Sequence, residues 1–453
     1  MENKTKKITV VDVQRFGQKL IIPEGMSYNE AIEALHKQNK YEETNVSFSE
    51  EIKGYFVLDA AFSFYCTLLE QFGMVHQAVT PSFFGDKPPR MIQVAVAEDE
   101  TAQIPWGRIT LPSMEGGYAE TGIGGDSRGA FLLLQITVKR KYSEIVKTLL
   151  QKTRLRLKKH SIYSGKAIEV RFRNDNKDHE GELLPFPEIK FMTGLNVKEE
   201  NIILNHDVKL QVIANLLTPI RRTKECEKFG IPTKRGVLLA GDYGAGKSLI
   251  ASLVASVAVD NKFTFVYIRD PKEFGDAHRV VEYYNPAVVF CEDIDPLMAV
   301  HDFKTSSTEL KSGNVERDQD MNLVLNILDG IETKGRSVIT VLTTNYLDKI
   351  HKAFLRPGRL DAVIIVDRPN KDSVLKLIHL YGKDLLLANE DFNPVAEILI
   401  GQQPAVIREV VERGKLLEIS LSDKPLTKLK LSAAALQASA SQMTKQMELL
   451  NKQ

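Results

Sequence analysis

The stretch Gly241-Asp242-Tyr243-Gly244-Ala245-Gly246-Lys247-Ser248 decides the fold of the central part of this chain. The apolar run Val237 to Ala240 precedes it, and the helix-compatible run Leu249 to Val254 follows. A strand, a glycine-rich turn and a helix in this order build a phosphate loop, because glycines let backbone N–H groups surround phosphate oxygens. A chance glycine turn would lack the flanking strand and helix. The sequence therefore predicts ATP bound by residues 241–249, with Lys247 on its terminal phosphates and the Ser248 hydroxyl on Mg²⁺.

An acidic pair follows another apolar run. Glu292 and Asp293 come directly after Ala287 to Cys291. Ligands of α/β sheets bind at the carboxyl ends of the strands, so we expect both carboxylates beside the phosphate loop. The alternative is a polar strand end that caps the following helix. We expect Glu292 to hold Mg²⁺ together with Ser248, and Asp293 to orient the water that attacks the terminal phosphate.

Two further sites lie downstream. The run Val341 to Thr344 ends with Asn345, an amide suited to orienting a water or sensing the terminal phosphate. Arg356 and Arg359 flank a Pro-Gly turn just before the apolar run Ala362 to Val366. Rigidly held guanidinium groups stabilise the charge that develops in phosphoryl transfer, and an ordinary surface salt bridge is the alternative. The expected catalytic residues are Glu292, Asp293, Asn345, Arg356 and Arg359.

The hydrophobic pattern divides the chain into three parts. Five apolar runs alternate with helix-spaced segments, which is typical of a parallel α/β sheet. The runs are Val237 to Ala240, Phe263 to Ile268, Ala287 to Cys291, Ser337 to Leu342 and Ala362 to Val366. Beyond Pro369 the strands stop, and Lys371 to Leu417 and Ala433 to Leu450 have helical spacing. We expect an α+β N-terminal domain at 1–190, an α/β ATPase core at 191–369 and a helical lid at 370–453, with the first boundary in the polar stretch Asn174 to Glu182.

The N-terminal 190 residues have a changing hydrophobic period, which indicates a mixed α+β domain. The expected elements are strands at Ile8 to Val13 and Lys19 to Ile22, and helices at Tyr28 to about Gln38 and Leu58 to Phe72. Ser27 and Glu30 form a capping box at the start of the first helix, and Gly73 ends the second. Six glycines crowd between Glu115 and Ala130. They fail as a dinucleotide fingerprint, since Ser127 stands at a glycine position, and they predict a mobile surface loop.

The bulk composition sets limits on function. With 453 residues, of which 43% are hydrophobic, the chain is long enough for two or three domains. The 60 Lys and Arg residues balance the 59 Asp and Glu residues, so global charge does not indicate nucleic-acid or polyanion binding. The three cysteines are far apart, which fits a reducing compartment. No apolar run is long enough to span a bilayer and no signal core follows the start, so we expect a cytoplasmic protein without a membrane anchor.

These motifs, in this order, resemble the classical clade of AAA ATPases, which includes proteasomal ATPases, membrane-bound bacterial AAA proteases, and the Golgi-fusion and ubiquitin-segregase motors. The resemblance covers roughly Ile202 to Leu450 and includes the lead-in Gly230 to Leu239. It implies that Lys247 and Ser248 are Walker A, Glu292 and Asp293 Walker B, Asn345 sensor 1, and Arg356 and Arg359 the arginines that reach a neighbouring subunit's nucleotide. It also implies a homo-oligomeric ring, usually a hexamer. No His-Glu-x-x-His motif occurs, so the zinc protease of some relatives is not expected.

Two segments suggest a narrower likeness. The sequences of Asn285 to Asp295 and of Pro404 to Arg413 are similar to those of a little-characterised set of AAA ATPases carried by bacteriophages. If the chain is phage-encoded, its expected compartment is the host cytoplasm. This likeness gives no substrate.

Three features of the family pattern bear on mechanism. The acidic pair is reversed from the usual Asp-Glu, so we expect slow turnover, or a shifted register in which Asp295 is the catalytic carboxylate. Ala405 stands where other AAA+ clades carry a second-sensor arginine. Arg408, one turn on, is either a substitute for that arginine or a solvent-exposed residue, and its neighbours Glu409 and Glu412 favour the second. The pore loop is shortened to Lys272 to Asp276, and Phe274 is expected to pack within the fold rather than grip a polypeptide.

The segment Lys139 to Lys159 holds nine Lys or Arg residues and one acidic residue, Glu144. Apolar residues at helical spacing give it one packing face, so its basic face is either a nucleic-acid groove or a solvated helix face, and the scarcity of aromatics favours the second. The leading hypothesis is ATP-driven remodelling of a protein or protein complex recognised by the N-terminal domain. The alternatives are a DNA-handling motor or loader and a nucleotide-gated scaffold that hardly turns ATP over.

Overall fold

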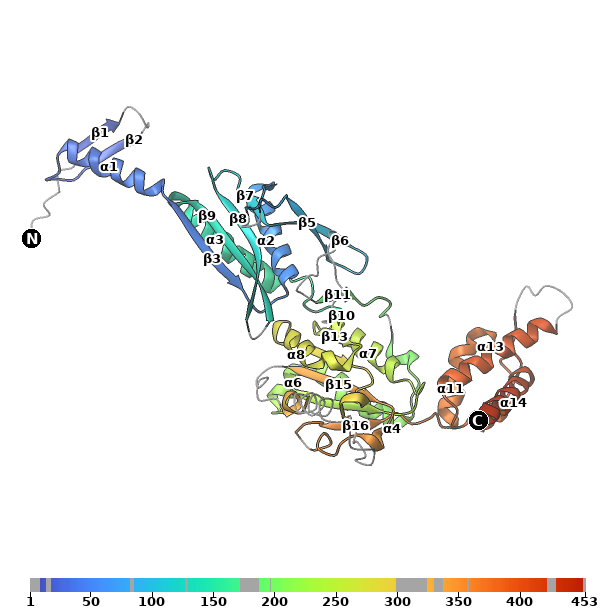
Figure 1. Ribbon diagram of the computed structural model, residues 1–453. Coiled ribbons are helices and arrows are strands. Elements are labelled where there is room, and N and C mark those ends of the chain that lie inside the picture. The colour runs from blue at the N-terminus through green and yellow to red at the C-terminus, as the bar shows by residue number, and fades with distance from the viewer. Residues whose placement is uncertain are drawn as a thin grey trace, which may run out of the picture. The chain divides into compact units, whose positions relative to one another are not determined.

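The computed structural model describes residues 9–13, 18–81, 85–126, 129–171, 187–195, 197–298, 324–329, 337–356, 358–421 and 429–450. The chain divides into two compact units, the first made of Met1–Val94 and Ala102–Ser161 and the second of Ala95–Thr101 and Ile162–Gln453. Figure 1 colours the first unit blue to blue-green and almost all of the second green to red. Across the described ranges, no helix combines the length and apolar composition needed to cross a membrane.

The core of the second unit is a seven-stranded sheet with the strand order β11-β10-β13-β14-β15-β12-β16. Its strands are β10 (Ala167–Arg171), β11 (Glu188–Phe191), β12 (Arg235–Ala240), β13 (Thr264–Ile268), β14 (Ala287–Cys291), β15 (Val338–Thr344) and β16 (Ala362–Ile365). The neighbouring pairs are parallel, except for the antiparallel pair of β10 and β11. The five apolar runs of the sequence form five neighbouring strands of this sheet, so the predicted α/β core is confirmed.

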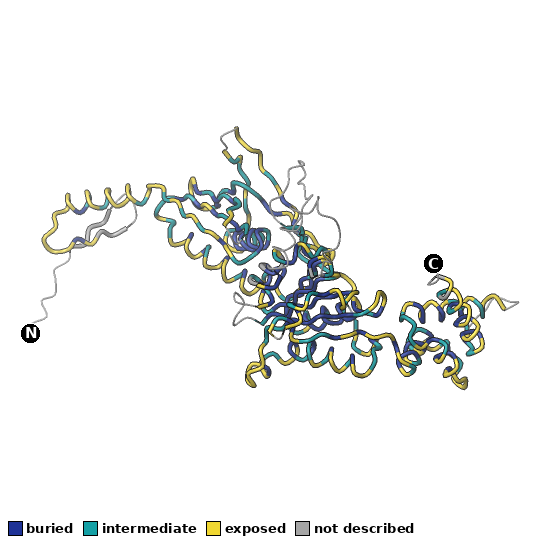
Figure 2. The backbone as a smooth tube through the Cα atoms, turned by 60° about the horizontal axis from the view of Figure 1, so that its bottom comes forward, coloured by how far each residue is buried: buried dark blue, intermediate teal, exposed yellow. Residues whose placement is uncertain are grey.

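The central strands of this sheet are buried on both faces. Every residue of β14 and β15 is buried, and Figure 2 draws this region dark blue. The helices of this part include α4 (His206–Val212), α5 (Thr218–Arg221), α6 (Thr223–Lys228), α7 (Lys247–Asp260), α8 (Phe274–Tyr283) and α9 (Asp295–Met298). Both α7 and α8 pack on β13 and β14. Most residues of α7 are apolar, and Ile250, Val254 and Ala255 lie in the core with no exposed surface.

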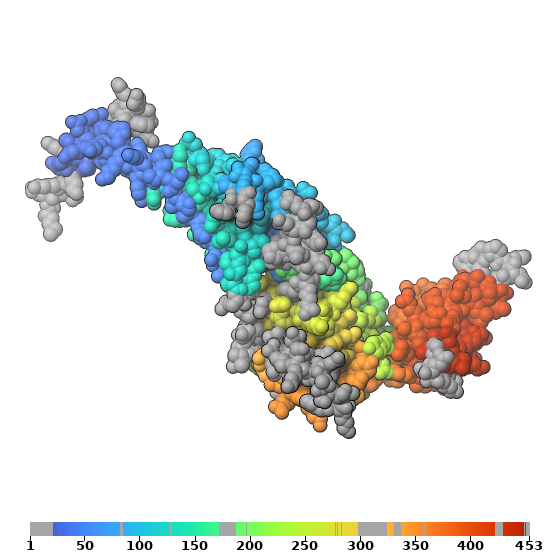
Figure 3. All heavy atoms as spheres, in the orientation of Figure 1, coloured from blue at the N-terminus to red at the C-terminus, as the bar shows by residue number. Residues whose placement is uncertain are grey.

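After the last strand the described residues form α-helices, and the helical region that the sequence predicts is present. These helices are α11 (Lys371–Gly382), α12 (Asn393–Leu399), α13 (Pro404–Ser420) and α14 (Ala433–Leu450), coloured orange to red in Figures 1 and 3. Asn370 caps the first of them, since its Oδ1 accepts from Ser373 N at 3.0 Å. Leu399, Ile407 and Leu436 lie fully buried in the core that these helices share.

The first unit is a mixed α+β structure. Its main sheet has the order β3-β9-β8-β7-β4, and all neighbours are antiparallel. These strands are β3 (Asn45–Ile52), β4 (His76–Gln77), β7 (Arg108–Thr110), β8 (Tyr118–Asp126) and β9 (Gly129–Lys139). Helices α2 (Val57–Phe72) and α3 (Ser143–His160) pack on each other and on β9. Two smaller sheets pair β1 (Thr9–Val13) with β2 (Gln18–Ile22), just before α1 (Tyr28–Glu42), and β5 (Arg90–Ala95) with β6 (Thr101–Trp106).

Local sequence signals place the ends of two helices in this unit. At the start of α1, Ser27 N donates to Glu30 Oε2 at 2.8 Å and Glu30 N donates to Ser27 Oγ at 3.3 Å, so the predicted capping box is present. The helix runs on to Glu42, one turn beyond its expected end. At the end of α2, Gly73 has a φ of 76°, the left-handed conformation that glycine adopts at low cost.

The predicted mobile loop between Glu115 and Ala130 is wrong. Most of this stretch forms β8 and the start of β9, which pair from Tyr118 to Asp126 with Thr137 to Gly129. Gly124 lies opposite Phe131, and a Cβ atom at position 124 would lie 2.3 Å from that ring. The glycine therefore leaves room for a cross-strand aromatic side chain. Composition does not distinguish this use of glycine from its use in a loop.

The junction between the two units lies earlier than the sequence suggests. The first unit ends at Ser161, and β10, which follows it, lies next to β13 in the sheet of the second unit. Residues 167–171 thus belong structurally with the α/β core, because they pair with β13. The expected boundary stretch Asn174 to Glu182 lies outside the described residues. The division into 1–190, 191–369 and 370–453 stays a prediction.

Candidate active site at the phosphate loop

Three strands of the parallel sheet bring the expected site residues to one edge. The phosphate loop follows β12, Glu292 and Asp293 follow β14, and Asn345 follows β15. The register aligns these ends, because Ala240 pairs with Thr344 and Cys291 with Leu342. Side chains that are far apart in the sequence therefore meet at the carboxyl edge of the sheet.

Lys247 begins α7, and its side chain folds back into the phosphate loop. Its ammonium group donates to the carbonyl oxygens of Gly241 at 2.6 Å and Asp242 at 3.0 Å, and to Asn345 Oδ1 at 2.8 Å. Burial lowers the pKa of Lys247, and nearby carboxylates, with Asp293 first among them, oppose this effect. The ammonium is thus held by neutral carbonyl and amide oxygens that phosphate oxygens can replace.

The other loop residues differ in exposure. Ala245 is buried, whereas Tyr243 and Leu249 are 60% and 43% exposed. The Tyr243 ring lies edge to face against Tyr346, with 6.3 Å between ring centroids. Gly246 has a φ of 108°, which a residue with a side chain rarely adopts.

Glu292 extends from the end of β14 to the start of α7. Ser248 Oγ donates to Glu292 Oε1 at 2.8 Å, and Tyr267 Oη donates to Glu292 Oε2 at 2.7 Å. Burial raises the pKa of Tyr267, and the hydrogen bond to Glu292 raises it further, so this phenol stays a donor at neutral pH. No motif in the sequence indicates Tyr267. The signal that could have found it is cross-strand register, since Tyr267 pairs with Phe290, two residues before Glu292.

Asp293 turns the chain toward the end of β15. Its φ is 47°, its amide donates to Thr343 Oγ1 at 2.9 Å, and its Oδ1 accepts from Asn345 Nδ2 at 2.8 Å. Asn345 therefore joins Lys247 to Asp293 through the two ends of one amide. Asp295 occupies a different place, because it accepts from Thr344 Oγ1 and from Asn345 N. Through these two contacts it supports the Thr344–Asn345 segment.

The donors at the phosphate loop fit a magnesium ion. Among the described residues, no group of three or more His, Cys, Asp or Glu side chains could hold a metal ion by itself. The Ser248 hydroxyl and the Glu292 carboxylate are two hard oxygen donors 2.8 Å apart. Mg²⁺ takes few protein ligands of this kind and fills its shell with phosphate and water oxygens.

The two arginines before β16 have different surroundings. Arg359 Nε and Nη2 donate to the two carboxylate oxygens of Asp329 at 2.7 and 2.8 Å, and its Nη1 donates to Ala353 O at 2.9 Å. The hydrogen bonds from Arg359 lower the pKa of Asp329. Arg356 is exposed; its carbonyl oxygen accepts from Arg359 N at 3.2 Å, and its side chain forms no hydrogen bond or ion pair with any described residue. Pro357, the other member of the expected turn, lies outside the described residues.

A third arginine, which the sequence analysis missed, contacts the loop. Arg368 Nε and Nη2 donate to Asp242 Oδ2 at 2.9 and 2.6 Å, and Nη1 donates to Gly401 O at 3.3 Å. It follows β16 closely and precedes α11, so it links the phosphate loop with the helical region. Ala405 and Arg408 are exposed, as expected of Arg408.

Phe274 cannot contact a polypeptide in a channel. It is the first residue of α8 and has no exposed surface. The predicted packing role is therefore confirmed for this side chain. Between β13 and α8, Arg269 and Lys272 are the exposed residues.

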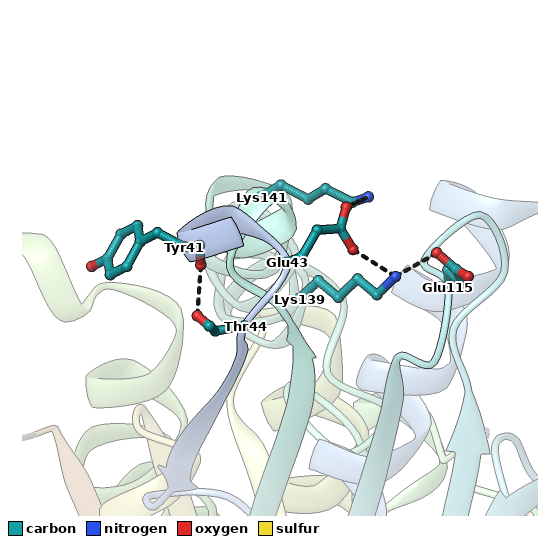
Figure 4. A network of polar contacts seen from close by, with 6 residues as sticks. All are labelled: Tyr41, Glu43, Thr44, Glu115, Lys139 and Lys141. Atoms are coloured by element: carbon teal, nitrogen blue, oxygen red, sulfur yellow. Dashed lines mark hydrogen bonds and ion pairs between the residues drawn. The ribbon is translucent and has the colours of Figure 1, made fainter. Parts of the chain in front are cut away.

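The basic segment around α3 is largely neutralised by neighbouring acidic residues. Lys139 contacts Glu43 at 2.7 Å and also Glu115, and Lys141 bonds the same Glu43 (Figure 4). Along the helix, Arg154 pairs with Glu50 and Arg156 with Glu70, while Lys147 pairs with Glu144 at 2.7 Å. Five of its nine cations thus have a carboxylate partner within the unit. This arrangement fits a solvated helix face better than a groove for phosphates.

Comparison with known proteins identifies the α/β part of the chain. Residues 237–368 match the family described as ATPase family associated with various cellular activities (AAA). Over 263 residues, the chain is 30% identical to the proteasome-activating nucleotidase of Methanothermobacter thermautotrophicus, a match that covers 52% of this chain and 60% of that protein. It is 28% identical over 241 residues to the ATP-dependent zinc metalloprotease FtsH of Mycoplasma mobile, covering 51% and 33%. The FtsH of Helicobacter pylori is 25% identical over 231 residues, covering 49% and 36%.

These matches have limited extent. The chain spans between 33% and 60% of the length of these curated relatives. Within that extent, it contains an AAA ATPase domain homologous to those of the nucleotidase and the metalloproteases. The α/β fold with a helical C-terminal region and the assignment as an ATPase are thereby confirmed.

Proposed function

We propose that this chain, whose residues 237–368 match the AAA ATPase family, hydrolyses ATP with Mg²⁺ in a homo-oligomeric ring, a hexamer, and thereby remodels a protein or protein complex. The observation that carries the proposal is the line of contacts from Lys247 through Asn345 to Asp293 beside the phosphate loop. The names of the relatives, a proteasome-activating nucleotidase and ATP-dependent metalloproteases, support a protein as the target.

Nucleotide binding begins with an exchange at Lys247. The ammonium gives up the carbonyl oxygens of Gly241 and Asp242 and bonds the terminal phosphates instead, while the N-terminus of α7 adds its positive dipole. Ser248 and Glu292 would hold Mg²⁺. When bound, the ion neutralises phosphate charge and polarises the bond to be broken.

Water activation falls to Asp293. Asn345 fixes one oxygen of its carboxylate at 2.8 Å, so the other oxygen can accept a proton from a water near the terminal phosphate. An aspartate is one methylene shorter than the usual glutamate, and misplacing a reactant by about 1 Å can cost ~10²-fold in rate. We therefore propose a slow basal ATPase that accelerates when a partner closes the ring.

Arg356 and Arg359 have different roles in this proposal. Arg356 is exposed, which suits a group that reaches the terminal phosphate of a neighbouring subunit. Arg359 is tied to Asp329 and Ala353 within its own subunit, which suits a residue that holds the turn in place. Nucleotide would then lie between subunits, with the phosphate loop of one and Arg356 of the next.

Partner recognition belongs to the N-terminal domain in this proposal. The buried Phe274 leaves the loop after β13 without an exposed aromatic side chain, so we propose remodelling of a bound partner rather than a grip through this residue. DNA handling is the weaker alternative, because five of the nine cations around α3 have carboxylate partners. The slow-turnover scaffold differs from the leading proposal only in rate.

ATPase assays separate the three functions. Turnover is measured alone, with a permanently unfolded protein and with double-stranded DNA, at equal nucleotide saturation. Stimulation by the unfolded protein supports remodelling, stimulation by DNA alone replaces it with a DNA motor, and tight binding without turnover under all three conditions indicates a scaffold. An Asp293→Asn variant used as an affinity trap in native extract, with Lys247→Ala as the matched control that binds no nucleotide, would identify the target.

Three finer points complete the proposal. The region 1–190 is the recognition domain, the chain is similar to bacteriophage-encoded AAA ATPases, and the compartment is the cytoplasm, that of the host if a phage encodes the chain. These points rest on sequence resemblance and composition alone.

A further inference from the structure

We propose that Tyr267 is a positioning residue that orients Glu292 for the magnesium site, and that it is what allows a glutamate to stand where the family has an aspartate. This inference rests on the proposed role of Glu292 as the carboxylate that faces Mg²⁺. It concerns a side chain on a neighbouring strand that the phosphate-loop motifs do not include.

Both carboxylate oxygens of Glu292 have a defined partner. Oε2 accepts from Tyr267 Oη at 2.7 Å, and Oε1 accepts from Ser248 Oγ at 2.8 Å. The first contact is a hydrogen bond to an ionised group, which is stronger than one between neutral groups. It fixes the plane of the carboxylate and leaves Oε1 on the side of the phosphate loop.

Tyr267 is itself held rigidly. It lies in β13, where its backbone pairs in register with Phe290 of β14. Its ring stacks on the Phe290 ring with 6.0 Å between centroids and 10° between planes. The phenol oxygen is therefore fixed relative to the end of β14, from which Glu292 extends.

A glutamate needs this support more than an aspartate does. Its carboxylate is one rotatable bond farther from the backbone, so it has more conformations to lose on binding a metal ion. A partner that holds the unused oxygen removes most of those conformations in advance. In other proteins, residues that hydrogen-bond to a metal ligand orient it, and removing them weakens metal affinity by roughly 10–100-fold. We assign this role to Tyr267.

The test measures magnesium affinity rather than turnover. Binding of a fluorescent ADP analogue is followed while Mg²⁺ is titrated, in the full-length protein and in Tyr267→Phe, which keeps the ring stack and removes only the hydroxyl. We expect the Mg²⁺ concentration at half-effect to rise about tenfold, with unchanged affinity for the analogue in EDTA. Tyr381→Phe, at a partly buried tyrosine of α11, is the control and should leave both values unchanged.

Glu292→Gln separates this inference from the proposed function. If it raises the Mg²⁺ requirement and Tyr267→Phe does not, the role of Tyr267 is refuted while that of Glu292 stands. If Glu292→Gln leaves the requirement unchanged, the proposed metal role fails and the inference fails with it. If both raise it, Tyr267→Phe should add little in the Glu292→Gln background, because the hydroxyl acts through the carboxylate. Full additivity would show that Tyr267 acts by another route and would overturn the inference.

Discussion

Replacing Asp293 by asparagine tests the active site most directly, because it removes a charge and changes the shape very little. An amide at this position still accepts the 2.8 Å hydrogen bond from Asn345 Nδ2. It cannot take a proton from water, and loss of a general base lowers a rate by roughly 10²–10⁴-fold. That range corresponds to about 3–5 kcal/mol of activation free energy. Nucleotide affinity should not fall, because the change removes a negative charge close to the phosphate site.

The assay compares phosphate release with MgATP binding on the same preparation. Asp295→Asn is the matched control, since Asp295 bonds Thr344 and the backbone of Asn345. This variant should be less stable than the parent but should retain the chemical step of hydrolysis. We expect Asp293→Asn to bind MgATP and turn over at least ~10²-fold more slowly. Normal hydrolysis by Asp293→Asn together with an inactive, folded Asp295→Asn would refute the assignment and move the catalytic carboxylate two residues along the chain.

Three further predictions concern the same site. Lys247→Ala should abolish nucleotide binding, because it removes the ammonium that meets the terminal phosphates; a variant that binds a fluorescent ATP analogue as well as the parent would contradict the phosphate-loop assignment. Arg356→Ala should lower turnover by about 10³-fold with little change in ATP affinity, whereas Arg359→Ala should also lower the melting temperature slightly, because it unpairs Asp329. Mixing Arg356→Ala with Lys247→Ala subunits should restore part of the activity, and no rescue after demonstrated subunit exchange would argue against shared sites. Restoring the usual order with Glu292→Asp and Asp293→Glu should not raise turnover, because position 293 has a φ of 47°, which glutamate adopts less readily than aspartate; a faster enzyme would contradict this reason.

The sequence was sufficient wherever the signal is local. The phosphate loop, the apolar strands before Glu292 and Asn345, the capping box at Ser27 and the stop at Gly73 all depend on a few adjacent residues, and the structure has each of them. A role that depends on pairing between strands cannot be predicted from adjacent residues, because the partner lies elsewhere in the sequence. Tyr267 and Gly124 acquire their roles from Phe290 and Phe131 on neighbouring strands, so adjacent residues indicate neither the contact of Tyr267 nor the strand position of Gly124.

The extension of the sheet illustrates the same limit. β10 is a short strand without a motif, and its sequence alone does not distinguish it from the strands of the N-terminal region. Its place is set by pairing with β13, nearly a hundred residues later. Arg368 likewise gains its contact with Asp242 only when the end of β16 comes beside the phosphate loop. Such contacts follow from the three-dimensional arrangement and from no single stretch of sequence.

The conformation at Asp293 gives a physical reason for the reversed acidic pair. Successive residues of a strand point to opposite faces, so a straight continuation of β14 would separate the two carboxylates. The φ of 47° at Asp293 breaks that alternation and turns its side chain to Asn345, while its amide bonds Thr343. Besides glycine, only Asp and Asn enter this left-handed region readily, and for other residues it costs about 1–2 kcal/mol. The short acid therefore stands where the chain must turn, and the long acid stands at the straight end of the strand, where it can reach Ser248 with Tyr267 to hold it.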